Sequence, residues 1–171
     1  LKPVVERAAR QRRQPVPQLL ARAKGLVRPF AGGGAARPVD VAGERRFALS
    51  ELVRGHSHGQ RFISPHDGLS GVELAFGTFA RINTGPVVFH LRTNPGATTD
   101  LATVTVPAYA LADGQMHRFS FPPIRDSQGR WFYVMVEAPE SVPGDAVTLW
   151  ARVLPPGVPG VTAARGPYSG G

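Results

Sequence analysis

Short runs of apolar residues, each followed by turn-forming residues, repeat from about residue 44 to residue 153. Within one run, Val72, Leu74 and Phe76 take every second position, which is the spacing of one face of a strand. The other runs have a similar length and content of β-branched and aromatic residues. The pattern therefore predicts eight strands, over residues 46–52, 60–63, 72–76, 87–91, 101–106, 116–121, 131–136 and 146–153.

Turn chemistry separates these runs, and no helical periodicity lies between them. Asn, Asp, Gly and Pro gather at residues 83–85, 94–96, 113–114, 126–129 and 143–145. About eight strands with no intervening helix predict an all-β fold, an antiparallel two-sheet β-sandwich. Several connections are longer than a hairpin needs, which favours a jelly roll, in which the chain crosses between the sheets.

A different pattern precedes the strands, at residues 17–30. Its apolar residues recur at the spacing of one helix face: Leu19, Leu20, Ala23, Leu26, Val27 and Phe30. Basic residues lie off this stripe, so the segment predicts a basic amphipathic α-helix. A helix of about three turns is not stable alone in water. It must therefore pack on the neighbouring domain, contact an anionic membrane surface or bind nucleic acid.

These patterns divide the chain into four parts. They are a basic helical connector at 1–30, a Gly-rich linker at 31–39, the β-sandwich at 40–154 and a Pro/Gly-rich tail at 155–171. The chain does not begin with Met, so we expect it to be a piece of a longer protein.

The net charge of +8 is confined to the N-terminal quarter. Residues 1–46 hold eleven basic and three acidic residues, and the remaining residues hold nine of each. A nucleic-acid-binding domain would carry its basic face on the folded body, so no nucleic-acid partner is expected. Of 20 basic residues 18 are Arg, which is typical of a G+C-rich bacterial genome. The chain has no Cys, which excludes disulfides and thiolate metal sites.

Candidate catalytic and metal-binding residues are few. No G-x-S-x-G motif is present, and Asp113, Asp126 and Asp145 stand in turns, so we expect no catalysis by this chain. His56 and His58, with Asp67 nearby, are candidate zinc ligands. Oxygens of residues 64–68 are an alternative site for a structural Ca²⁺. Solvated loop residues are the other interpretation of both groups, and no cofactor is expected.

Sugar binding is the chemistry that the strand residues suit best. His90 and Arg92 alternate outward on one predicted strand, and Arg81 is expected on a neighbouring strand; all three can donate to hydroxyls or carboxylates. On residues 131–136, Trp131 and Tyr133 share one face, and Phe132, Val134 and Val136 share the other. Either set can be the core, so Trp131 and Tyr133 are either a sugar platform or buried packing.

Residues 60–153 resemble the galactose-binding-like jelly-roll domains of bacterial glycosyltransferases and polysaccharide-assembly proteins. Three segments carry the resemblance: FISPHDGLSGVELAFGTFARINTGPVVFHLR, LADGQMHRFSFPPIRDSQGRWFYVMVEAP and GDAVTLW. The resemblance implies a non-catalytic accessory module, with the chemistry on a separate domain of the same protein.

The expected function is therefore to bind or position a glycan for a larger glycosyltransferase. The alternative is a docking or oligomerisation domain without a sugar ligand. The expected location is cytoplasmic, with peripheral membrane contact through residues 17–30 as a further alternative.

Overall fold

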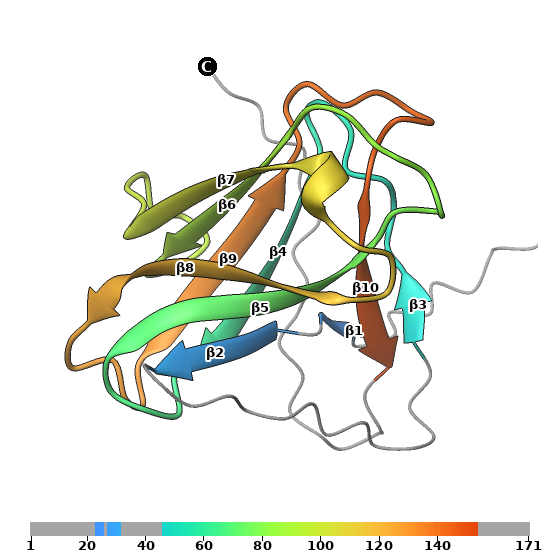
Figure 1. Ribbon diagram of the computed structural model, residues 1–171. Coiled ribbons are helices and arrows are strands. Elements are labelled where there is room, and N and C mark those ends of the chain that lie inside the picture. Colours follow the sequence, from blue (N-terminus) through green and yellow to red (C-terminus); the bar gives the residue numbers. More distant parts are fainter. Residues whose placement is uncertain (1–22, 26, 32–45, 154–171) are drawn as a thin grey trace, which may run out of the picture.

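Two antiparallel sheets form the structure, a computed structural model that describes residues 23–25, 27–31 and 46–153 (Figure 1). The strands are β1 (Ala23–Gly25), β2 (Val27–Ala31), β3 (Arg46–Ala48), β4 (Ser57–Ile63), β5 (Leu69–Gly77), β6 (Pro86–Arg92), β7 (Ala102–Pro107), β8 (Met116–Ile124), β9 (Trp131–Glu137) and β10 (Thr148–Val153). One 3-10 turn, η1 (Ala108–Ala110), connects β7 to β8. Each of the eight predicted strands overlaps one of β3 to β10, so this part of the prediction is confirmed.

One sheet has four strands in the order β4-β9-β6-β7. The other has six and is centred on β5, which pairs with β2, β8 and β10. Leu74 pairs with both Val27 of β2 and His117 of β8, so β2 and β8 lie on opposite edges of β5. β10 pairs with the last two residues of β5 and extends beyond it to β1 and β3.

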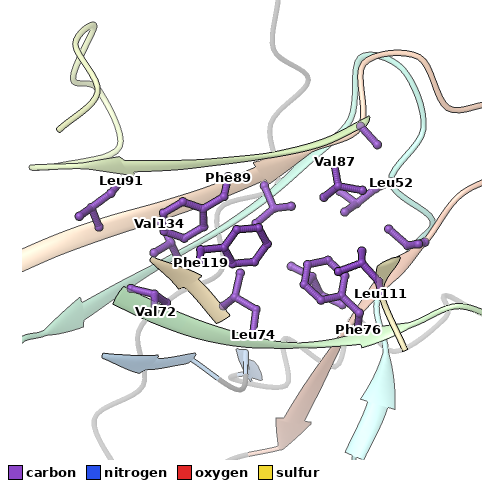
Figure 2. Close-up of a cluster of buried hydrophobic side chains, with 14 of the residues drawn as sticks. Leu52, Val72, Leu74, Phe76, Val87, Phe89, Leu91, Leu111, Phe119 and Val134 are labelled. Atoms are coloured by element: carbon purple, nitrogen blue, oxygen red, sulfur yellow. The ribbon is translucent and has the colours of Figure 1, made fainter. Parts of the chain in front are cut away.

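The core lies between the two sheets, as Figure 2 shows. Phe89 of the four-stranded sheet stacks on Phe119 of the six-stranded sheet, with ring centroids 4.7 Å apart and planes 11° apart. Leu74 and Phe76 of β5 face Leu91 and Val87 of β6 across the same space (Figure 2). Both sheets thus bury one face against the other, which is the arrangement of a β-sandwich.

The predicted helix is wrong over the part of residues 17–30 that the structure describes. Residues 23–25 and 27–31 are strands, which pair with β10 and β5. Gly25 and Pro29 weaken a helix at this place. Strand pairing instead bonds the backbone of these residues to β10 and β5, and Pro29 is tolerated because β2 is an edge strand. These residues therefore belong to the β-domain, and so does Ala31, which was predicted as the first residue of the linker but ends β2. Residues 1–22 and 26 of the predicted connector, residues 32–39 of the predicted linker and the predicted tail at 155–171 lie outside the described residues.

Candidate functional site

The four-stranded sheet turns one face away from the core, and we call it the outer face. By strand alternation and register it consists of Ser57, Gly59, Arg61, Ile63, Pro86, Val88, His90, Arg92, Thr103, Thr105, Pro107, Trp131, Tyr133, Met135 and Glu137. The opposite side chains of β9, Phe132, Val134 and Val136, are in the core. The alternative left open by the sequence is thereby decided: Trp131 and Tyr133 point outward.

A network of hydrogen bonds and ion pairs occupies the middle of the outer face. Asp100, at the end of the β6–β7 loop, accepts a hydrogen bond from Nε of Arg92 at 2.5 Å. Its other oxygen lies 2.7 Å from Nδ1 of His90 and 3.1 Å from the hydroxyl of Thr103. Burial raises the pKa of Asp100, but the hydrogen bonds from Arg92 and His90 outweigh it and leave the pKa below its usual value. Asp100 is thus held as a carboxylate.

Arg92 and His90 use their polar groups within the protein. Arg92 is only 7% exposed, and its Nη1 also lies 3.9 Å from the sulfur of Met135. His90 Nε2 is buried and lies 3.3 Å from Oε1 of Glu137. Both residues face outward, as the alternation predicts, but this network limits their access to a ligand.

The ring of Tyr133 lies over Gly59 of the neighbouring strand β4. A Cβ atom on Gly59 would be 1.9 Å from the Tyr133 hydroxyl oxygen and 2.3 Å from the adjacent ring carbon. The missing side chain at residue 59 therefore makes room for the phenol, which is 7% exposed. Burial raises the pKa of Tyr133, and the charges of Arg92 and Arg61 oppose this shift.

Three exposed residues adjoin on the β4 side of the outer face, Trp131, Ile63 and Arg61, and we call them the Trp131 patch. Ile63 is directly opposite Trp131 in the register of β4 and β9, and Arg61 is opposite Tyr133. Trp131 is 53% exposed and Ile63 is 46% exposed. Of these three residues, only Trp131 was a candidate from the sequence. That Ile63 and Arg61 lie beside it depends on the register of two strands about 70 residues apart in the chain.

Arg81 does not belong to this face. Its Nη2 donates to Oε1 of Glu51 at 2.7 Å and to the carbonyl of Ala146 at 3.1 Å, and its guanidinium lies 4.8 Å from the centre of the Phe79 ring. These contacts place Arg81 at one end of the sandwich, which we call the loop end. There the β3–β4, β5–β6 and β9–β10 connections meet η1, at the top of Figure 1.

Four large apolar side chains are exposed at the loop end: Phe79, Ile82, Tyr109 and Val142. Ile82 is 86% exposed and Tyr109 is 70% exposed. Phe79 and Ala80 both have positive φ angles, 56° and 54°, a conformation that costs free energy in residues other than glycine. Asp113, which accepts from the backbone N–H of Thr78 at 2.6 Å, anchors this loop at its start.

The candidate zinc ligands do not converge. His58 points inward with Nε2 2.8 Å from the carbonyl oxygen of Ser50, and His56 is exposed in the preceding turn. Asp67 follows the opposite end of β4, about 20 Å of strand away. Among the residues that the structure describes, no group of three or more His, Asp or Glu side chains is arranged to hold a metal ion.

The oxygens of residues 64–68 have partners within the protein. Asp67 accepts a hydrogen bond from the backbone N–H of Ser127 at 2.8 Å, and the carbonyl oxygen of His66 accepts from the hydroxyls of Ser64 and Ser127. Backbone hydrogen bonds from Ser127 and Gly68 lower the pKa of Asp67. These contacts join the β4–β5 loop to the β8–β9 turn, which is a structural role.

Comparison with protein-family models, with curated proteins and with solved structures returns no match to this chain. Within the described ranges, no helix has the length and apolar character needed to cross a membrane.

Proposed function

We propose that this chain is a non-catalytic carbohydrate-binding β-sandwich of jelly-roll type, an accessory module of a larger bacterial glycosyltransferase or polysaccharide-assembly protein. The single observation that carries the proposal is the exposure of Trp131 on the outer face. An indole ring turned to solvent offers an apolar surface for the C–H face of a sugar and an N–H for its hydroxyls. A tryptophan that only fills the interior of the protein would be buried, so the half-exposed ring of Trp131 favours a role in binding.

The path of the chain supports the jelly-roll part of this proposal. From β3 to β10 the chain changes sheet at every connection except the one between β6 and β7. Such repeated crossing between two antiparallel sheets is typical of jelly rolls.

The outer-face network supports binding in preference to catalysis. General acid–base chemistry needs a titratable group within reach of the substrate. Asp100 is held ionised by Arg92 and His90, and the free edge of the His90 ring is buried against Glu137. The network instead joins β9, the strand that carries Trp131, to β6 through the His90–Glu137 and Arg92–Met135 contacts, which helps to hold Trp131 in place.

Affinity electrophoresis through gels that contain bacterial surface polysaccharides tests this proposal. The wild-type chain should be retarded by at least one polysaccharide, and Trp131→Ala should lose at least about tenfold in affinity, as expected for an aromatic hot spot. Tyr109→Ala is the matched control, since it removes another exposed aromatic ring at the loop end. Retardation that Trp131→Ala leaves unchanged, or the absence of retardation by every polysaccharide, contradicts the proposal.

The loop end favours a second candidate function, a docking domain without a sugar ligand. Its four exposed apolar residues lie beside charges of opposite sign, since Arg81 forms an ion pair with Glu51 and also interacts electrostatically with Asp145. Two copies of this chain can therefore meet there with little charge repulsion. Sedimentation velocity should then show self-association that Ile82→Asp abolishes and that the control Ile63→Asp retains. A monomer at all concentrations excludes this candidate.

A further inference from the structure

The geometry points to a glycan that carries carboxylate groups, a uronic-acid-type polysaccharide, which stacks on Trp131 and pairs with Arg61. This inference rests on the proposed sugar-binding function and names its ligand class. The inference is based on two arginines that flank Tyr133 on the outer face, Arg92 on β6 and Arg61 on β4. They differ in exposure and in whether a carboxylate of the protein is bound to them.

Arg92 is already neutralised. It is buried, and the carboxylate of Asp100 takes its Nε–H at 2.5 Å. Arg61 is exposed, and among the described residues it has no carboxylate within ion-pair distance. An exposed guanidinium beside an exposed indole therefore has its fork of donors available for an external acid.

The register brings Arg61 close to the aromatic platform. Ile63 lies opposite Trp131, and Arg61 is two positions before Ile63 on the same face of β4. Diagonal neighbours on one face of an antiparallel pair have Cβ atoms about 7–8 Å apart, within reach of an arginine and a tryptophan side chain. A sugar ring on the indole can thus place a substituent at the guanidinium.

The surrounding charges favour an anion at this edge of the sheet. The two carboxylates attached to the outer face, Asp100 and Glu137, contact His90, and Asp100 also binds Arg92. β4 is the edge strand, so the Trp131 patch lies on the side of the sheet away from Asp100. The turn before Trp131 has Arg125 and Arg130 with Asp126, and Asp67 accepts a hydrogen bond from Ser127 of the same turn, so these charges balance and Arg61 is the cation that remains for a ligand. A neutral sugar would leave Arg61 without a partner, whereas a uronate provides one.

Calorimetric titration of the full chain with alginate and polygalacturonate tests the ligand class. The matched probes are the same two polymers with their carboxyl groups reduced to alcohols, which keeps the linkages and removes the charge. We expect binding of at least one acidic polymer, about tenfold weaker for its reduced form and for Arg61→Gln. Trp131→Ala should also lose about tenfold.

Two control variants make the result specific. Arg54→Gln removes an exposed arginine of the loop end and should bind as the wild type does. Arg61→Lys keeps the charge without the planar fork and should fall between the wild type and Arg61→Gln. Since Arg61 is exposed, circular dichroism of the Arg61 variants should match the wild type.

The outcomes separate this inference from the proposed function. If acidic and reduced polymers bind equally, through Trp131 but without Arg61, the ligand class is wrong and sugar binding stands. If Arg54→Gln weakens the binding of acidic polymers as much as Arg61→Gln does, general charge attraction explains the binding. The inference then fails. If no polymer of either kind binds, and none of the bacterial polysaccharides does, both the inference and the proposed function are overturned.

Discussion

Replacing Gly59 by alanine is expected to destabilise the protein through one neighbour, Tyr133. The three heavy atoms nearest to a Cβ at residue 59 all belong to Tyr133, at 1.9, 2.3 and 2.9 Å. Ordinary van der Waals contact begins at about 3.4 Å, so the phenol has to move by about 1.5 Å or more. Tyr133 is 7% exposed, and such a movement gives up part of its packing on the outer face.

The loss in free energy of unfolding caused by Gly59→Ala can be estimated from this geometry. Adding a methyl group to a packed position costs about 1–3 kcal/mol when neighbours must leave their preferred positions. The backbone of Gly59 does not have a positive φ angle, so alanine itself fits the strand. Alanine is even favoured over glycine within a strand, by about 0.5–1 kcal/mol. The clash with Tyr133 should therefore cost about 1–3 kcal/mol, and after the gain from alanine the net destabilisation of Gly59→Ala should be up to about 2.5 kcal/mol.

A double-mutant cycle measures this coupling. Urea unfolding at pH 7, followed by circular dichroism, gives the free energy of unfolding of the wild type, Gly59→Ala, Tyr133→Ala and the double variant. We expect Gly59→Ala to destabilise the wild type and to be neutral or stabilising once Tyr133 is alanine. If Gly59→Ala costs the same free energy in both backgrounds, Tyr133 is not the cause, and glycine is not needed at residue 59 to make room for its ring.

Three further changes test other parts of the structure by urea unfolding. Asp100→Asn should lower the free energy of unfolding by about 1–3 kcal/mol at pH 7, because Arg92 stays buried without its anionic partner. Burial raises the pKa of Asp100, but hydrogen bonds from Arg92 and His90 lower it overall, so its stabilisation is present above about pH 4 and is lost as pH falls further. The difference in free energy of unfolding between the wild type and Asp100→Asn should thus be smaller at pH 3 than at pH 7. A difference that does not change with pH contradicts the stabilising role of the Asp100 carboxylate. Ala80→Gly should raise the free energy of unfolding by up to about 1 kcal/mol by relieving the positive φ angle, and a decrease would refute the argument from strain. Gln60→Met should raise it by about 1 kcal/mol, because both polar atoms of the buried Gln60 amide have no hydrogen-bond partner in the structure; a loss of stability would show that the amide is paired.

The strands of the sandwich could be predicted because their signals are local. Alternation in residues 72–76 and the turn residues that follow each run depend on only a few neighbouring positions, and the structure has strands there. β1 and β2 could not be predicted in this way. Their apolar residues fit a helical period, but their partners are β10 and β5, which lie far along the chain. Pairing with the sheet makes these residues strands instead of a helix. That pairing depends on residues far along the chain, which a short sequence window does not include.

The orientation of β9 shows a related limit. Both faces of residues 131–136 are apolar or aromatic, so alternation alone does not say whether Trp131 or Phe132 is in the core. The decision comes from the stacking of Phe132 on Phe62, with ring centroids 5.8 Å apart, and from the other core residues on that face. Trp131 is left opposite Ile63, where no described layer of the sandwich packs over the outer face.

The two arginines beside Tyr133 explain why a binding role could not be assigned from residue type. Arg92 was predicted as a ligand donor because it alternates outward, but the β6–β7 loop returns Asp100 to its guanidinium. Arg61 has the same chemistry and orientation, and no loop returns an acid to it among the described residues. The difference lies in the path of one loop. The polar residues that a sequence pattern selects on a sheet face are therefore often those that hold the sheet together, and the cation left unpaired beside an exposed indole is the better candidate for contact with a ligand.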